Sequence, residues 1–195
     1  MPTDLTETAI MNMALDLLIE ESIDDTSDDR PVARWLARNY ETVRDALLRQ
    51  HPWNFALKRD SLAADPTAPA FEWAYRYLLP SDCLRLLPLT VAGDMNGSPI
   101  WHVVEGLYLL TDEPAPLKVK YIARIENPGL FDPNFVNALV HILANKAAHW
   151  MTGKAGFAEK LRDPTREAIF NAQLLDSLEG SAASPADYDI IAARQ

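Results

Sequence analysis

The sequence predicts an α+β fold: a helical bundle built from helices at both ends of the chain, a small antiparallel β-sheet inserted between them, and an extended C-terminal tail. Apolar residues recur at helical spacing in residues 4–50 and 133–178, whereas they alternate at strand spacing in residues 53–125. Prolines and glycines separate the alternating segments, as expected for short strands joined by turns. The chain of 195 residues therefore divides into a domain of residues 1–180 and a tail of residues 181–195.

The N-terminal part predicts two helices joined by a turn. The first covers residues 4–20 and can be capped by Asp4 or Thr6. The second begins at Pro31, because proline favours the first turn of a helix. It should end at about Gln50, since a proline two residues further on pushes the backbone out of helical geometry.

The turn between these helices is strongly acidic, with the sequence EESIDDTSDD. It contains Asp24, Asp25, Asp28 and Asp29, and we expect Asp28 or Asp29 to cap the second helix. Asp24, Thr26 and Asp28 are spaced like ligands of a calcium loop. The glycine at the sixth position and the distal glutamate that such a loop needs are missing, so we expect a solvated turn.

The segment HPWNFA, residues 51–56, marks the change from helix to sheet. Trp53 and Phe55 alternate with smaller residues, so we expect them to begin a strand and to anchor the core between helices and sheet. Asn54 is expected to cap or bridge local backbone groups rather than to take part in chemistry. The aromatic pair is therefore interpreted as a core anchor and not as an active site.

Four further segments predict strands of one small antiparallel sheet. FEWAYRYLL repeats the aromatic alternation, and its Trp73 and Tyr75 are expected to be core anchors on the same side. PSDCLRLLPL predicts a strand, IWHVVEGLYLLTDE predicts a hairpin that turns at Glu105 and Gly106, and LKVKYIARI predicts the last strand.

Helical spacing returns after Asp132, which can cap a helix whose first turn holds Pro133. A last helix is expected over residues 157–178, where Pro164 should restart or kink it. The tail follows a linker of small residues and ends in ADYDIIAARQ. We expect this tail to dock on a partner through its apolar side chains, which are Tyr188, Ile190 and Ile191.

Charge and composition narrow the classes of function. The formal net charge of −10 disfavours tight binding to nucleic acid, because an acidic surface does not neutralise phosphates. The single cysteine, Cys83, excludes an internal disulfide, fits a reducing compartment, and is expected to be a small buried residue. No run of about 18 apolar residues is present, so a membrane span is not expected.

No set of residues predicts catalysis or the binding of a cofactor. His141, Asn145 and His149 share one helical face, but no carboxylate completes a metalloprotease pattern. The sequence has no glycine-rich phosphate loop, nucleophile elbow or CxxC pair. We therefore expect a protein that is not an enzyme and that has no catalytic residue, metal or cofactor.

Four short motifs follow one another along the chain. They are HPWNFA, the PxDCLR segment of residues 80–85, EGxxLLTDE of residues 105–113 and YIARxxxPxxFDPxF of residues 121–135. In this order and spacing they resemble the tail tubular protein A family, the head-to-tail adaptors of short-tailed bacteriophages. The similarity covers roughly residues 8–178, and the sequence departs from it at Pro164, where the family has an unbroken helix.

The resemblance implies a structural virion protein. Members of this family form a ring of about twelve subunits between the portal protein and a tail nozzle protein (tail tubular protein B-like). Genomic double-stranded DNA passes through the ring without specific binding. The expected location is the neck of the virion, after assembly in the bacterial host cytoplasm. On this basis the acidic turn should lie at a subunit interface or at the lumen, and residues 181–195 should dock on the portal.

Three alternatives remain open. The first is another tail-completion or connector ring protein, which the ring's neighbours in a particle would distinguish. The second is a small enzyme, although the sequence offers no residue for the chemistry. The third is a nucleic-acid-binding regulator, against which the net charge argues.

Overall fold

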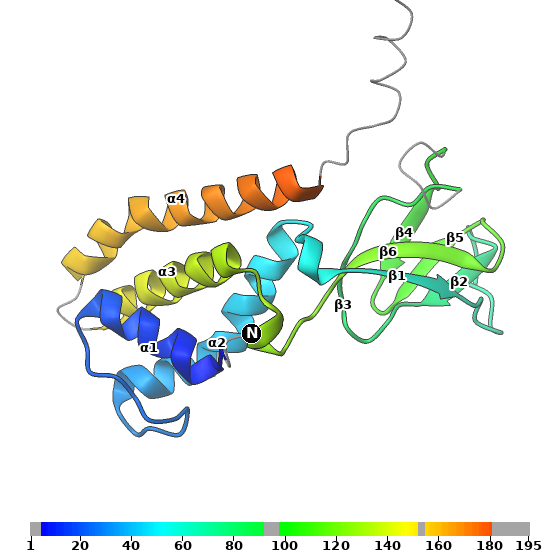
Figure 1. The fold of residues 1–195 in the computed structure, drawn as a ribbon. Coiled ribbons are helices and arrows are strands. Elements are labelled where there is room, and N and C mark those ends of the chain that lie inside the picture. Colours follow the sequence, from blue (N-terminus) through cyan, green and yellow to red (C-terminus); the bar gives the residue numbers. More distant parts are fainter. Residues whose placement is uncertain (1–4, 92–97, 152–154, 181–195) are drawn as a thin grey trace, which may run out of the picture.

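The structure is a computed structural model, and it describes residues 5–91, 98–151 and 155–180. In this part of the chain, four helices gather on one side and six short strands on the other (Figure 1). The fold is therefore mixed α+β, as predicted. The predicted docking residues of the tail, Tyr188, Ile190 and Ile191, lie outside the described residues.

The helices and strands come in the order that the sequence pattern predicts. They are α1 (Glu7–Leu18), α2 (Pro31–Gln50), β1 (Leu57–Leu62), β2 (Tyr75–Leu78), β3 (Cys83–Leu86), β4 (His102–Glu105), β5 (Tyr108–Thr111), β6 (Leu117–Ala123), α3 (Pro133–Trp150) and α4 (Ala155–Gly180). Two short 3-10 turns, η1 (Asn54–Ala56) and η2 (Pro128–Leu130), flank the β region.

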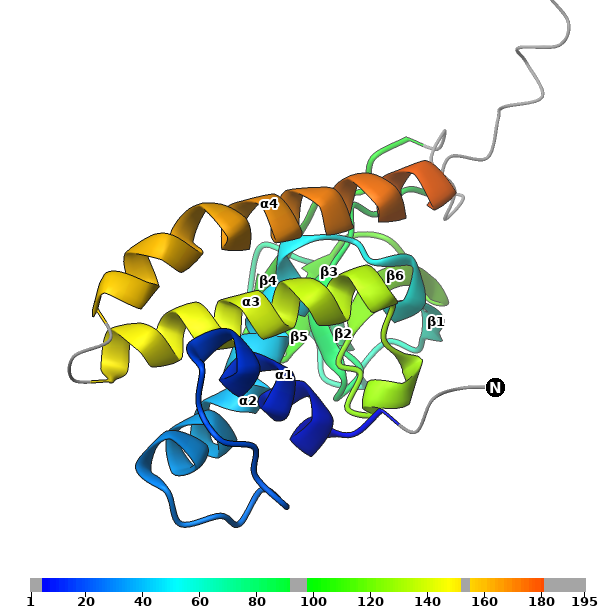
Figure 2. The ribbon, with the colours of Figure 1, turned by 60° about the vertical axis from the view of Figure 1, so that its left-hand side comes forward.

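The central helix of the bundle is α3. It contacts α1, α2 and α4, and it runs between α4 on one side and the α1–α2 pair on the other (Figures 1 and 2). Its buried face includes Phe135, Leu139 and Leu143, each fully shielded from solvent. Small buried residues, such as Ala147 on α3 and Ala158 on α4, let neighbouring helices approach closely.

Two of the three predicted helix caps are confirmed. The Thr6 hydroxyl accepts a hydrogen bond from the amide of Ala9, and the Asp132 carboxylate accepts one from the amide of Asn134. The cap predicted at Asp28 or Asp29 is wrong, because Arg30 occupies the N-cap position of α2 without a side-chain cap. Asp28 instead accepts a hydrogen bond from the Arg30 amide and so closes the preceding turn.

The strands form two three-stranded antiparallel sheets rather than the single sheet predicted. One has the order β1-β6-β3 and the other has the order β2-β5-β4. The predicted start of the first strand at Trp53 is also wrong. Residues 54–56 form the turn η1, and β1 begins only at Leu57, because Trp53 and its neighbours pack against the helices.

The predicted hairpin is confirmed. β4 pairs with β5 from Glu105 opposite Tyr108 to His102 opposite Thr111. Gly106 in the turn has a φ of +61°, a conformation that glycine adopts without the steric cost that a Cβ brings.

Of the restart or kink predicted at Pro164, the restart is not found, because α4 is one continuous helix across this residue. Proline removes one backbone hydrogen bond from a helix. The neighbouring Thr165 hydroxyl donates to the carbonyl oxygen of Leu161 at 2.6 Å and lies 3.3 Å from that of His141 on α3. Packing along α3 therefore holds the two halves of α4 together.

Candidate interaction surfaces

The HPWNFA segment lies where the helices meet the strands. α2 ends at Gln50, and the chain then turns so that Trp53 enters the core, where it is fully buried. The indole nitrogen of Trp53 donates to the carbonyl oxygen of Leu47 at 3.0 Å, so its one polar group is satisfied. The predicted role of Trp53 as a core anchor agrees with this placement.

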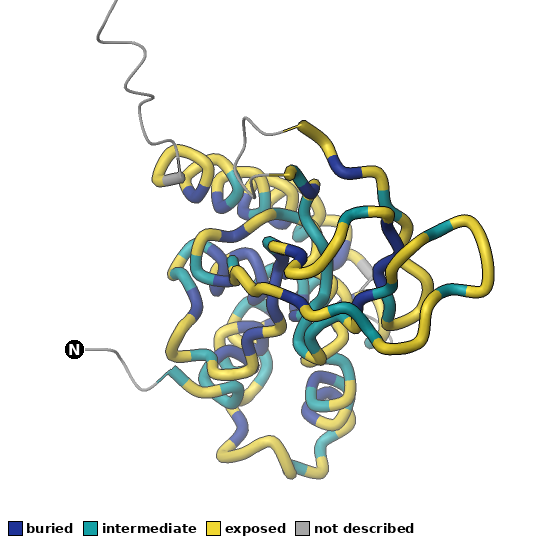
Figure 3. Tube along the Cα trace, turned by 90° about the vertical axis from the view of Figure 1, so that its right-hand side faces the viewer, coloured by how far each residue is buried: buried dark blue, intermediate teal, exposed yellow. Residues whose placement is uncertain are grey.

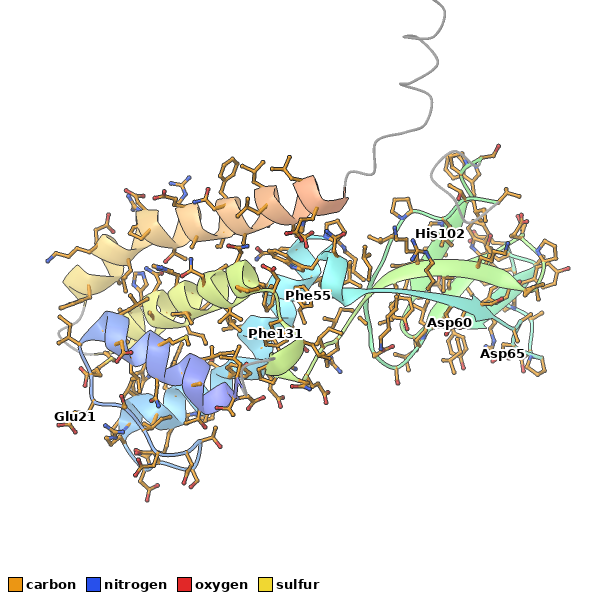
Figure 4. The ribbon with its side chains drawn as sticks, in the orientation of Figure 1. Glu21, Phe55, Asp60, Asp65, His102 and Phe131 are labelled. Atoms are coloured by element: carbon orange, nitrogen blue, oxygen red, sulfur yellow. The ribbon has the colours of Figure 1, made fainter. Side chains whose placement is uncertain are left out.

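Phe55 belongs to a cluster of four aromatic rings, together with Trp53, Phe131 and Phe135. Its ring lies 5.1 Å from that of Phe135 and 6.0 Å from that of Phe131, and Phe135 lies edge-on to Trp53 at 5.1 Å. Figure 4 shows Phe55 and Phe131 at the boundary between helices and strands. Two motifs that are distant in sequence, HPWNFA and FDPNF, therefore build one aromatic cluster.

A buried carboxylate on α4 fastens this junction. Asp176 is 7% exposed, and its carboxylate accepts a hydrogen bond from the Asn54 amide at 2.9 Å and lies 3.0 Å from His51 Nε2. The side-chain amide of Asn54 also donates to the Asp176 carbonyl oxygen at 2.7 Å. Three contacts thus hold α4 to the turn after α2, which we call the Asp176 clamp.

The clamp corrects the role predicted for Asn54, and it contains one residue, Asp176, that the sequence analysis did not predict. Asn54 was expected to bridge local backbone groups, whereas it reaches a residue 122 positions away. Asp176 was not singled out at all. A signal was present, because Ala168, Ala172 and Asp176 follow one another at four-residue spacing, so the carboxylate continues a row of small residues on the buried face of α4.

The second predicted aromatic pair behaves differently from the first. Trp73 is half-buried, and it lines a small hollow of about 240 Å³. The prediction that Tyr75 is a core anchor is wrong, since it is 37% exposed. The physical reason is that Tyr75 is the first residue of β2 and lies at the exposed end of the strand. Before it, Glu72 has a φ of +69°, so Phe71 and Trp73 do not continue the alternation of the strand. Tyr77 is the buried member of this series.

The acidic turn lies at the end of the molecule away from the strands, as the position of Glu21 in Figure 4 shows. Asp24, Asp25 and Asp29 are exposed, whereas Asp28 is half-buried. Hydrogen bonds from the side chain and amide of Ser27 lower the pKa of Asp25. Those from the side chain and amide of Arg30 lower the pKa of Asp28.

Arg30 also binds the carbonyl oxygens of Glu21 and Ser22, so one guanidinium group organises the turn. The exposed carboxylates beside it, Asp24, Asp25 and Asp29, are available to a partner surface.

The last helix presents an apolar row to solvent. Phe170, Leu174 and Leu178 follow at four-residue spacing and are 63%, 45% and 63% exposed. The opposite side of α4, which carries Ala172 and Asp176, packs on the rest of the protein. The inner face of α4 therefore packs on the protein, while its outer face is an exposed apolar surface that a partner could cover.

The histidine-containing face of α3 shows no arrangement for catalysis. The side-chain amide of Asn145 donates to the carbonyl oxygen of Ala158, and burial lowers the pKa of His141. His149 is exposed near the end of the helix. Within the described ranges, no three His, Cys, Asp or Glu side chains are grouped as a metal site would need.

Cys83 is half-buried rather than fully buried, and burial raises the pKa of its thiol.

Comparisons with known proteins add no family. A scan against models of protein families found no matching family, and a search of curated proteins found no significant match. In the part of the chain that the structure describes, no helix has the length and apolar character to cross a membrane.

Proposed function

We propose that this chain is a structural subunit of a head-to-tail adaptor ring in a short-tailed bacteriophage. In this role it sits between the portal and the tail nozzle, and genomic DNA passes through the ring. The subunit acts through its shape and its contacts, without a catalytic step or a cofactor.

The outward apolar row of α4 is the observation that carries this proposal. With 26 residues, α4 is about 39 Å long, comparable to the width of a small domain. Its row of Phe170, Leu174 and Leu178 is exposed, although each side chain would gain from leaving water. Contiguous exposed apolar surface of this kind is typical of protein interfaces. A ring subunit needs such a surface for its neighbours.

The motifs behind the family resemblance support the same proposal. HPWNFA and FDPNF meet in the aromatic cluster, and the Asp176 clamp connects HPWNFA to α4. The motif residues therefore have a structural task, which is to hold the outward helix in place against the bundle. A set of motifs with this task is expected in a protein that works by assembly.

The charge distribution is compatible with a DNA passage. The chain carries a formal net charge of −10, and the acidic turn places exposed carboxylates together. A negatively charged lumen repels the phosphate backbone, so DNA slides past without being held. The same charge argues against a regulator that binds DNA tightly.

Cryo-electron microscopy of tailed particles whose genome contains this coding sequence tests the proposal. We expect the chain in a closed ring against the portal, with the outward face of α4 in a subunit interface. A Phe170→Glu variant should fail to join the ring while keeping the circular dichroism spectrum of the wild type. Asn137→Glu, at an exposed position on α3, is the matched control and should assemble normally. Absence of the chain from the neck of the particle would overturn the proposal.

A further inference from the structure

The edge of β6 that faces β3 is only partly paired. The Lys120 carbonyl accepts a hydrogen bond from the Leu87 amide at 2.9 Å, which is the last backbone contact on this side. Leu89 is the next residue whose backbone groups would point toward β6, because such groups alternate along a strand. Leu89 then turns away, because its carbonyl accepts from the Ile100 amide at 3.0 Å.

The missing contacts leave Lys118 at an open edge. Backbone groups two residues apart in a strand point to the same side, so those of Lys118 point the same way as those of Lys120. On this side, no backbone partner of Lys118 is found among residues 5–91, 98–151 and 155–180. An edge of this kind accepts an added strand, with main-chain hydrogen bonds supplying affinity.

A hollow of about 980 Å³ lies along this open edge. Its lining consists of residues 87–90, residues 59–61 of β1 and residues 118–120 of β6. Leu89 and Val119 in its lining are buried, so the hollow reaches the apolar core of the β region.

The two faces of the sheet beside the hollow differ in charge. Arg59 is directly opposite Lys120 in the register, and Ser61 is opposite Lys118, so these three cations share one face. Asp60, Val119 and Leu117 belong to the other face, where Leu117 and Val119 are buried. Like charges opposite each other destabilise a strand pair. No ion pair joins Arg59, Lys118 or Lys120 to an acidic side chain in the described chain, so an acidic partner would relieve their repulsion.

The C-terminal segment of the same sequence has the complementary pattern. Residues 187–190 read Asp-Tyr-Asp-Ile, so acidic and apolar side chains alternate at the two-residue period of a strand. In an extended conformation, one side of this segment would present two carboxylates and the other side would present Tyr188 and Ile190. That is the pattern that a strand added at Lys118 would need.

We infer that residues 187–190 of a neighbouring copy add as a strand to the open edge of β6. The carboxylates then face Arg59, Lys118 and Lys120, and the apolar side chains cover Val119. This inference rests on the proposed function in one respect, because it requires copies side by side. Fully extended, residues 181–186 span at most about 22 Å, which is enough to leave one copy and reach a surface packed against it.

Binding of a labelled peptide of residues 181–195 to the full-length chain, measured by fluorescence anisotropy, tests the inference. Four combinations are compared: wild-type or Lys118→Glu/Lys120→Glu chain, each with wild-type or Asp187→Lys/Asp189→Lys peptide. We expect binding when charges are complementary, that is, in the wild-type pair and in the doubly reversed pair. The two mismatched pairs should bind at least about tenfold more weakly, because like charges meet in the hollow.

A chain with Lys146→Glu and Lys160→Glu is the matched control. It has the same change in net charge on exposed helical positions, so it should bind the wild-type peptide as the wild-type chain does. Circular dichroism melts of every variant show whether the fold is retained. Equal binding in all four combinations would overturn the inference. Binding in the doubly reversed pair alone would also overturn it, because the hollow of the wild-type chain would then be filled by the tail of the same chain and not by that of a neighbour.

The outcomes also separate this inference from the proposed function. A ring in the particle together with absent peptide binding overturns the strand addition and leaves the adaptor ring standing. Charge-dependent peptide binding without a ring in the particle overturns the adaptor role and leaves the strand addition standing. Docking of the tail on the portal, the expectation from the family resemblance, would appear as binding to the portal that survives Lys118→Glu/Lys120→Glu, with no binding between copies.

Discussion

The helical part and the β part of the molecule bury their side chains to different extents. The largest fully buried side chains come mostly from the helices and the junction, while the strands contribute Tyr77, Leu109, Leu117 and Ile122. Large apolar side chains are exposed throughout the β part, such as Trp101 at 86% and Leu107 at 71%. In Figure 3 the strands face the viewer, and exposed and half-buried stretches dominate there.

This difference suggests separate roles, in which the helical part contributes most to stability and the β part offers surfaces for binding. The bundle around α3 supplies most of the side chains of one continuous core, which extends from there into the β part. The β part consists of two sheets of three strands, which is near the smallest size that is stable. Its exposed side chains and its open edge are therefore the places where partners can add contacts.

The largest expected effect on stability comes from replacing a tryptophan by alanine, once at the junction and once in the β part. Trp53→Ala removes a fully buried indole at the junction and should lower the free energy of unfolding by about 3–5 kcal/mol. Trp101→Ala, at an exposed position in the β part, should change it by less than about 0.5 kcal/mol. Urea unfolding followed by circular dichroism measures both. Equal losses would mean that Trp101 is packed as firmly as Trp53, which would contradict its exposure.

The Asp176 clamp should have the next largest effect. Asp176→Ala leaves the Asn54 amide and the His51 ring without their acceptor, so we expect a loss of about 1–3 kcal/mol in the free energy of unfolding. Asp163 is the control on the same helix, with its side chain 81% exposed. Asp163→Ala should be close to neutral in the same urea experiment. A clamp variant as stable as this control would mean that packing alone holds α4.

The smallest expected effect on stability comes from removing the hydroxyl of a buried tyrosine, and its sign should differ between the two parts. Tyr77 in β2 donates its hydroxyl to the Glu113 carbonyl at 2.8 Å, so Tyr77→Phe should cost about 1 kcal/mol. Tyr40 in α2 is buried, and its hydroxyl has no hydrogen-bond partner among the described residues. Burial raises the pKa of Tyr40, so the group stays neutral. Tyr40→Phe should therefore be neutral or stabilising by up to about 1 kcal/mol.

Thermal unfolding of these two single variants, carried out side by side, measures the difference in sign. If both substitutions destabilise to the same degree, the Tyr40 hydroxyl has a partner, such as an ordered water molecule, that offsets its burial.

The helices could be predicted because each depends on local signals. Apolar spacing, the caps at Thr6 and Asp132, and the prolines that flank α2 all act within a few residues. The fold class followed from the change of period between the ends and the middle of the chain. The strand segments were recognised for the same reason, apart from the start at Trp53.

The rest depends on contacts between distant residues, which spacing does not encode. Alternation shows that a segment is a strand, but it does not show which strand lies beside it, so two sheets were predicted as one. Asn54 and Asp176 are 122 positions apart, and the sequence near either residue does not indicate that it contacts the other. A restart of the helix at Pro164 was predicted from propensity, whereas packing against α3 keeps the helix continuous.

The aromatic cluster also has a consequence for how the gene can change. Phe55 precedes the β part and Phe131 follows it, yet their rings are only 6.0 Å apart, so the chain leaves the bundle and returns to it at one place. The entropy of closing a loop grows slowly with its length, so a longer or shorter excursion from this point costs the bundle little. The β part is thus an insertion at one point of the bundle, and a change in the length of its outer loops is expected to disturb the helices least.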